Sequence, residues 1–231
     1  MLISSTHRFI FIHIPKTAGT SVTKALAPNC LNTPFSAGSA LMRGLPVQQS
    51  PETAWFQMHD TASFVRKKLS PPVFDSFLRF AVVRNPFDHA ISHFEFIKTY
   101  RYKRLAQKVQ AMSFRDYLNW RLAAPQSRWM SRTGLFARLP DQSHYVTATD
   151  GTLLVNRVLK FDTLNRDLNT LTADLGINTP TLGHARKSKR QGRGQPLAAL
   201  YEPDTIDLVT RLYDRDFALF DYARTPPEGD V

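Results

Sequence analysis

A short segment near the start of the chain carries side chains of the types that can bind phosphate. It consists of Lys16, Thr17, Ala18, Gly19, Thr20 and Ser21. The lysine supplies a positive charge, the three hydroxyls donate hydrogen bonds, and the glycine lets the backbone come close to a ligand. The segment follows an apolar run at 8–14 and precedes a predicted helix at 22–27, so N–H groups at the helix start would face an anion. Its order is not that of a Walker A loop, which ends in Gly-Lys-Ser/Thr, and the alternative is a plain turn with an exposed lysine.

A second polar group follows the apolar run at 77–83. Arg84 stands where an ATP-hydrolysing P-loop protein would place an aspartate for Mg²⁺. Its positive charge suits a further phosphate group bound without metal. Ser92 lies on the helix that follows and could donate to the same anion. The alternative is a structural arginine that pairs with Asp88.

Together the two motifs resemble those of sulfotransferases that use 3′-phosphoadenosine 5′-phosphosulfate (PAPS). His13–Ser21 is similar to the 5′-phosphosulfate loop of that family, and Phe80–Ser92 is similar to its 3′-phosphate motif. The likeness is to the carbohydrate sulfotransferase group that includes the heparan 2-O and chondroitin enzymes and bacterial homologues. The resemblance implies that the segment from Lys16 to Ser21 binds the 5′-phosphate and that Arg84 and Ser92 bind the 3′-phosphate. It also implies that 3′,5′-adenosine bisphosphate (PAP) is the product.

A basic loop at 183–196 is a further candidate for donor binding. The resembling family closes this region over the adenosine bisphosphate, which implies contacts from Lys187, Ser188 and Arg190. This chain departs from the family there, since it reads Ala-Arg-Lys-Ser instead of the usual Asn-x-Ser, and it has His89 where the family commonly has arginine. The alternatives for the loop are nucleic-acid binding or a solvated charge run.

His59 is the candidate base, because transfer to a hydroxyl releases a proton and histidine titrates at about pH 6.5. Members of the resembling family place a catalytic His or Glu in the corresponding region. The alternative is a solvated or capping histidine, in which case the role would pass to Glu95, Glu52 or Asp60. Lys16 is the second catalytic candidate, placed to stabilise negative charge on the departing phosphate.

The rest of the chain must position these motifs, and its pattern alternates strands and helices. Apolar, β-rich runs predict buried strands at 8–14, 77–83 and 157–161. Helical spacing predicts helices at 22–27, 61–69, 86–108, 113–122, 164–175 and 204–213. The predicted N-caps are Asp60, Asn85 and Ser113, the last in a capping box with Asp116. This order predicts an α/β fold with a mostly parallel sheet, and the resemblance implies a P-loop-like three-layer α/β/α core.

Length and composition limit the remaining possibilities. The 231 residues predict one domain, 1–231, with insertions at about 28–58 and 98–150 that shape the acceptor site. Lys and Arg number 30 against 19 Asp and Glu, a net charge of +11 that predicts anionic partners. The single cysteine excludes an internal disulfide and a multi-cysteine metal site, and no metal is expected. No apolar run could span a membrane, so we expect a soluble, cytoplasmic protein, with peripheral membrane association as the alternative.

Three function classes follow from these observations. The first is a sulfotransferase that moves a sulfuryl group from PAPS to a hydroxyl, less readily an amine, of a glycan or glycolipid. The second is a P-loop kinase or NTPase, which requires a Gly-Lys-Ser/Thr order and a strand-end carboxylate that this chain lacks. The third is a nucleic-acid-binding domain, which rests on net charge alone because no helix-turn-helix or zinc-ligand spacing is present.

Overall fold

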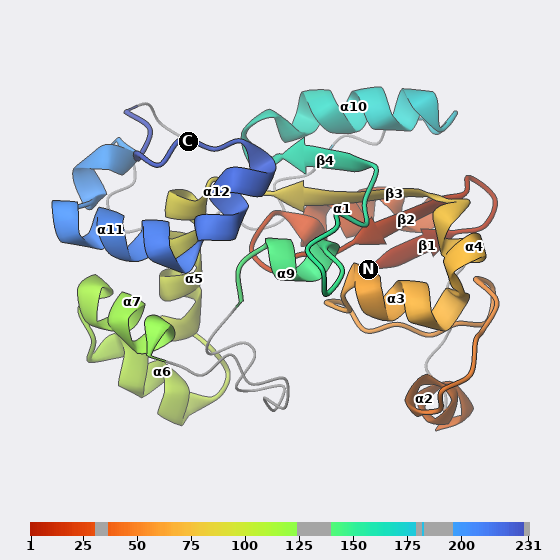
Figure 1. Cartoon of the computed structure of the whole chain (residues 1–231), viewed down its shortest axis with the longest axis horizontal. Coiled ribbons are helices and arrows are strands. Elements are labelled where there is room, and N and C mark those ends of the chain that lie inside the picture. The colour runs from red at the N-terminus through yellow and green to blue at the C-terminus, as the bar shows by residue number, and fades with distance from the viewer. Residues whose placement is uncertain (31–36, 124–139, 179–181, 183–195, 229–231) are drawn as a thin grey trace. The chain divides into compact units, whose positions relative to one another are not determined.

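A computed structural model describes residues 1–30, 37–123, 140–178, 182 and 196–228 (Figure 1). They form two compact units. The first comprises the described parts of Met1–Val83 and His144–Ala185, and the second those of Arg84–Ser143 and Arg186–Val231. The first unit holds the sheet and the candidate phosphate-binding segment, and the second is helical in its described part.

The first unit is organised by a four-stranded sheet in the order β1-β2-β3-β4. The strands are β1 (Leu2–Ser4), β2 (Phe9–Ile12), β3 (Leu78–Val83) and β4 (Arg157–Lys160). β2, β3 and β4 run parallel, whereas β1 pairs antiparallel with β2. The predicted α/β class with a mostly parallel sheet is therefore confirmed. β1 was not predicted, because three residues are too few to show a periodic pattern.

The central strands β2 and β3 are buried on both faces over most of their length, which explains why they are almost continuously apolar, whereas β4 at the edge is partly exposed and begins and ends with a basic residue. On one face, side chains of β2, β3 and β4 pack against α1 (Gly19–Leu26) and α10 (Leu164–Asp174). The strand residues of this face are Phe9, Phe11, Phe80, Val82 and Leu159. The alternating residues Ile10, Ile12, Ala81 and Val83 are also fully buried. Burial on this scale contributes about 1.5–3 kcal/mol for each large side chain and holds the strand ends in place.

The other helices of the first unit differ in part from the sequence predictions. Two are the 3₁₀ helices η1 (Ala27–Asn29) and η2 (Phe161–Thr163). The α-helices are α2 (Ala37–Gly44), α3 (Ala62–Leu69) and α4 (Pro71–Asp75). A short helix, α9 (Ser143–Val146), contains the chain position at which the second unit ends and the first resumes. α2 lies in a segment whose sequence shows little periodicity. The prediction that Asp60 caps α3 is wrong, because the Thr61 hydroxyl accepts the hydrogen bond from the Phe64 N–H. Asp60 instead forms an ion pair with Arg43.

The second unit is a cluster of helices around an aromatic core. Its elements are α5 (Pro86–Lys98), α6 (Lys103–Gln110), α7 (Phe114–Leu122), η3 (Leu197–Leu200), α11 (Pro203–Leu212) and α12 (Asp214–Phe220). The N-caps Asn85 and Ser113 are confirmed. The single helix expected at 86–108 is wrong: Thr99 and two tyrosines, which are weak helix formers, separate α5 from α6. None of the helices described in either unit is long and apolar enough to cross a membrane.

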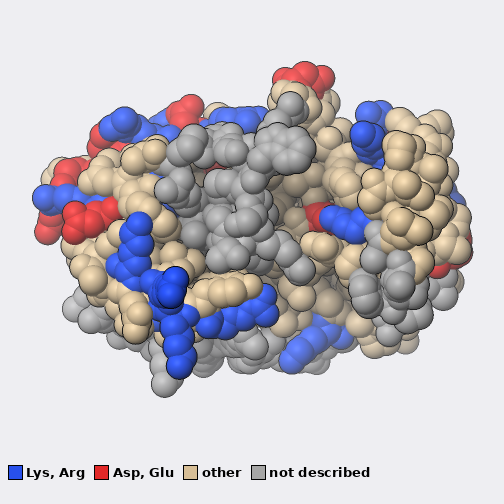
Figure 2. All heavy atoms as spheres, turned by 90° about the horizontal axis from the view of Figure 1, so that it is seen from below, with Lys and Arg blue, Asp and Glu red and all other residues tan. Residues whose placement is uncertain are grey.

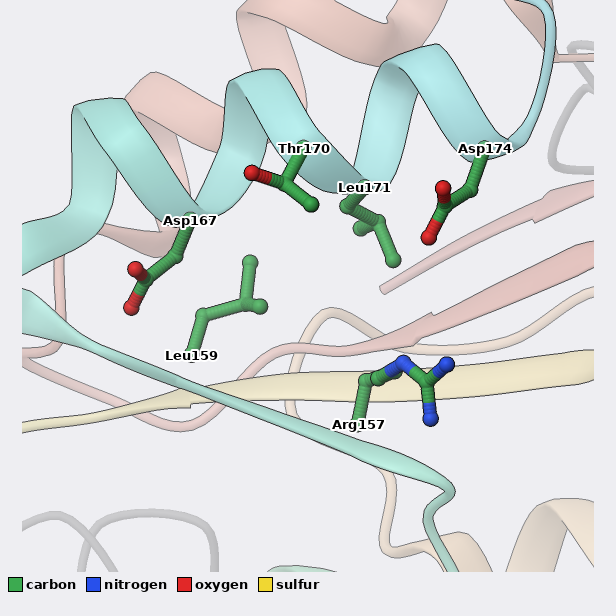
Figure 3. Close-up of a pocket in the computed structure, with 6 residues that line it drawn as sticks. All are labelled: Arg157, Leu159, Asp167, Thr170, Leu171 and Asp174. Atoms are coloured by element: carbon green, nitrogen blue, oxygen red, sulfur yellow. The ribbon is translucent and has the colours of Figure 1, made fainter.

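A small pocket of about 200 Å³ lies between β4 and α10 (Figure 3). Its lining residues are Arg157, Leu159, Asp167, Thr170, Leu171 and Asp174. The pocket lies along the side of β4, against α10, and not beyond the carboxyl ends of the strands. Ligands of open parallel sheets bind beyond the carboxyl ends of the strands instead. We therefore look for the functional site at the carboxyl ends of β2 and β3.

Candidate active site

The segment between β2 and α1 has the backbone shape of an anion-binding loop. Lys16 and Ala18 adopt left-handed conformations, with φ of 67° and 62°. Thr17 between them is buried, and its hydroxyl donates to the Ile14 carbonyl over 3.0 Å. Left-handed residues that alternate with ordinary ones turn successive N–H groups toward one side, which forms a concavity for anions. Each left-handed non-glycine residue costs about 1–2 kcal/mol, and such strain concentrates at ligand-binding positions.

The start of α1 adds further donors to this loop. Ala18 is the N-cap and makes no side-chain capping bond, and the first turn contains no acidic residue. The Ala18 carbonyl accepts from the Ser21 and Val22 N–H groups. The N–H groups of Gly19 and Thr20 belong to the first turn, which has no intrahelical acceptors. The helix therefore presents donors and the positive end of its dipole where an anion would bind.

Gly19 is required by packing and not by its backbone angle. A Cβ atom at this position would overlap the imidazole ring of His13. The His13 side chain is only 3% exposed, so its ring cannot move aside without disturbing the core. Sequence reasoning missed this role of His13, since no spacing rule pairs a strand-end histidine with a glycine six positions later.

His59 lies beside this loop. Its Nδ1 atom is 2.8 Å from the His13 carbonyl oxygen, and the two rings meet edge-on with centroids 4.6 Å apart. A carbonyl oxygen only accepts hydrogen bonds, so Nδ1 carries the hydrogen and Nε2 keeps the lone pair. Burial lowers the pKa of His59 to about 4 and that of His13 to about 2. Both rings are therefore neutral at pH 7, and His59 has the tautomer that a base acting through Nε2 needs.

The other candidate bases are engaged elsewhere or exposed. The Asp60 carboxylate accepts from Arg43 Nη2 over 2.7 Å and from the Gln57 N–H over 2.8 Å. Glu95 pairs with Lys98 over 2.9 Å. Glu52 is exposed, and hydrogen bonds from its own N–H and from nearby serines lower the pKa of its carboxyl. His59 is the candidate that the fold brings to the phosphate loop.

In the second unit, Arg84 and Ser92 are joined by a direct hydrogen bond. Arg84 Nη1 donates to Ser92 Oγ over 2.9 Å, and Arg84 Nε donates to the Asp88 carboxylate. All three side chains are buried. The pairing of Arg84 with Asp88 is the structural arrangement that the sequence offered as an alternative. The same guanidinium also holds Ser92, so the two predicted phosphate ligands form one polar group.

Two further sequence expectations concern the donor. His89, at the position where the family commonly has arginine, is buried with its Nδ1 atom 2.9 Å from the Tyr213 hydroxyl. Lys187, Ser188 and Arg190 lie outside the described residues.

Comparison with known families identifies the chain. A model described as the sulfotransferase family matches residues 1–223. The chain belongs to the sulfotransferase family. Sulfotransferases of this family are enzymes that use PAPS, so the anion-binding loop belongs to a PAPS-dependent enzyme, and the kinase and nucleic-acid-binding hypotheses lose their support. No curated protein and no solved structure gives a significant match. The α/β architecture and mostly parallel sheet are consistent with the P-loop-like fold of sulfotransferases.

Replacing Gly19 by Ala will lower the free energy of unfolding by about 1–3 kcal/mol, because the added methyl group overlaps the His13 ring. Urea denaturation measures the loss. In a His13→Ala background the same substitution should cost less, since the ring is gone. Gly44→Ala is the matched control: nothing lies within 4 Å of a Cβ there, so stability should change by less than about 0.5 kcal/mol. An equal cost of Gly19→Ala with and without the His13 ring would contradict this account.

Proposed function

We propose that this sulfotransferase transfers a sulfuryl group from PAPS to a hydroxyl of a glycan or glycolipid, with an amine as the less favoured acceptor. The observation that carries the proposal is the loop after β2: left-handed Lys16 and Ala18, an uncapped helix start, and a neutral His59 beside them. Anion-binding donors and a base are the two groups that sulfuryl transfer to a hydroxyl needs.

The donor-binding roles follow the motifs of the family. Lys16, Thr17, Ala18, Gly19, Thr20 and Ser21 would hold the 5′-phosphate through backbone N–H groups, hydroxyls and the ammonium. Arg84 and Ser92 would hold the 3′-phosphate, and Lys187, Ser188 and Arg190 would add contacts from the late basic loop. Because the family match extends over residues from both units, we treat them as parts of one sulfotransferase domain, 1–231.

PAPS supplies the sulfuryl group and a phosphate leaving group. The acceptor oxygen forms a bond to sulfur while the bond from sulfur to the bridging phosphate oxygen breaks. His59 Nε2 takes the acceptor proton, and the donors of the loop stabilise the negative charge that stays on the phosphate. An anion held beside His59 favours its protonated form, so the pKa of His59 rises when the donor binds and the base gains strength.

A basic surface supports an anionic acceptor. Arg101, Lys103, Arg104 and Lys108 are exposed at the start of α6 and along it. No ion pair links these four side chains to a carboxylate within the described residues. Figure 2 shows several Lys and Arg side chains close together at the lower left of the view, with no Asp or Glu between them. A sulfated or carboxylated glycan would interact favourably with such a surface.

The donor assignment is tested by comparing PAPS with adenosine 5′-phosphosulfate, which lacks the 3′-phosphate. We expect calorimetry to give adenosine 5′-phosphosulfate a dissociation constant at least about tenfold higher than that of PAPS, since a charge-assisted arginine contact is worth about 1.5–3 kcal/mol. Sulfuryl transfer should also persist in EDTA, because Arg84 stands where a P-loop hydrolase has its metal-binding aspartate. Equal affinity for the two nucleotides, or activity that EDTA abolishes and Mg²⁺ restores, would speak against the assignment.

Lys16→Ala should lower kcat about 10²–10³-fold while donor binding changes little. The reason is that the ammonium acts mainly on charge that develops as the bond to sulfur breaks. Steady-state kinetics with varied PAPS separates the two effects. Lys24→Ala, which removes an exposed lysine from the last turn of α1, is the control and should keep normal kcat. A Lys16→Ala enzyme with normal kcat and a raised KM for PAPS would contradict this role, because it would show that Lys16 only helps to bind PAPS in the ground state.

His59→Ala should lower kcat about 10²–10⁴-fold and leave bisphosphate binding nearly intact. The base must be neutral, so activity falls as the pH drops through its pKa. For the wild type the acid limb of kcat/KM for PAPS, which reports the free enzyme, should lie near the His59 pKa of about 4 instead of 6.5. The limb of kcat should lie higher, because the bound donor raises that pKa.

In the His59→Ala variant, the acid limb of kcat/KM for PAPS and the acid limb of kcat should both disappear. Replacement of the exposed His144 by Ala is the control and should retain them. A His59→Ala enzyme that keeps most of its activity, or a limb unchanged by the substitution, would remove His59 from the mechanism.

A further inference from the structure

The backbone of Arg84 is held by the side chain of a residue far along the chain. Gln142 Oε1 accepts from the Arg84 N–H over 2.8 Å, and Gln142 Nε2 donates to the Arg84 carbonyl over 2.9 Å. One amide therefore pairs with both polar groups of a single residue. Gln142 is fully buried, and Arg84 is 8% exposed. Two opposed hydrogen bonds in a buried setting determine the orientation of the Arg84 peptide groups more tightly than either bond alone.

Gln142 is itself fixed by Asp216 on α12. The Asp216 carboxylate accepts from the Gln142 backbone N–H over 2.8 Å and from Gln142 Nε2 over 3.1 Å. It also accepts from the Ser143 N–H over 2.7 Å. Asp216 is fully buried, and three N–H donors offset part of its loss of hydration, although burial still raises the pKa of its carboxyl to about 7. These contacts orient the Gln142 amide, so that Nε2 faces the Arg84 carbonyl and Oε1 faces its N–H.

The residue held in this way is the first of the two proposed 3′-phosphate ligands, Arg84 and Ser92. Arg84 precedes the N-cap of α5, and its guanidinium reaches forward to Asp88 and Ser92 on that helix. A long side chain amplifies rotation of its own backbone, because the guanidinium lies several bonds from Cα. A small change at the Arg84 peptide groups would therefore displace the guanidinium from the geometry that binds phosphate.

We propose that Gln142 and Asp216 are positioning residues for the 3′-phosphate contact of Arg84. This inference rests on the proposed donor-binding role of Arg84. Neither residue touches the guanidinium in the described contacts, and both act on it through the backbone. The affinity of the enzyme for the 3′-phosphate thus depends on α12, a helix that follows Arg84 by about 130 residues.

The test compares two ligands that differ only in the 3′-phosphate: adenosine 3′,5′-bisphosphate and adenosine 5′-monophosphate. Calorimetry on the full chain measures both affinities for the wild type, Gln142→Met and Asp216→Asn. Methionine keeps the length of the side chain and removes both hydrogen bonds to Arg84. Asparagine keeps the shape of Asp216 and turns one accepting oxygen into a donor.

In both variants we expect bisphosphate affinity to fall about tenfold or more, with monophosphate affinity changed less than about twofold. In an Arg84→Ala background Gln142→Met should cause no further loss, because no guanidinium remains to be positioned. Thr205→Val is the control: it removes a buried hydroxyl that caps α11 through hydrogen bonds with Glu202, so it should leave the ratio of the two affinities unchanged.

A merely structural role would lower both affinities in parallel, and that result, or an unchanged ratio, would overturn the proposal. A wild type with no preference for the bisphosphate would overturn the donor-binding role of Arg84 itself, and this inference with it. If the variants do not fold, the wild type still provides a test by NMR. The side-chain amide resonances of Gln142 should shift when bisphosphate is added and not when monophosphate is added, and equal shifts would contradict the proposal.

Discussion

The contact between the His13 ring and the backbone of Gly19 is the constraint on which the phosphate loop depends. β2 is buried on both faces, so the strand delivers His13 to one position at its carboxyl end. The ring fills the space where any other residue at position 19 would place its Cβ. The glycine lets the first residue of α1 lie against this ring, directly after a loop that contains two left-handed residues. Packing at the strand end therefore sets the backbone that faces the anion.

The same histidine links the loop to the candidate base. Its carbonyl accepts the His59 Nδ1 hydrogen, which leaves the lone pair on Nε2, and burial keeps both rings neutral. A neutral base next to cationic and dipolar donors suits a reaction that moves negative charge onto a phosphate. In the second unit, Arg84 is also fixed by hydrogen bonds. Asp88 and Ser92 bond to its guanidinium, and Gln142 bonds to its backbone. The groups to which we assign chemistry are thus fixed in part by hydrogen bonds with residues that carry no such assignment, namely His13, Asp88 and Gln142.

Local signals succeeded where the interaction they describe is itself local. The caps Asn85 and Ser113 bond to N–H groups two and three residues away, and both were predictable. The cap assigned to Asp60 was wrong, because Arg43 and the Gln57 N–H engage its carboxylate and Thr61 takes the capping position. The break between α5 and α6 was missed because the local sequence signal continues across it. Lysine and arginine are good helix formers, so the basic residues on both sides of 99–102 predicted one unbroken helix.

The sequence by itself determined the α/β class, the parallel strands and the place of the candidate phosphate loop after β2, because apolar runs and a loop motif are contiguous in the chain. Together with the family match it also determined that the chain is a sulfotransferase. Only the tertiary structure decided that His13 demands a glycine at position 19, that His59 has its lone pair on Nε2, and that Gln142 and Asp216 hold Arg84. These contacts join residues that are 6 to 74 positions apart, and their geometry follows from how buried side chains fill space and satisfy their hydrogen bonds.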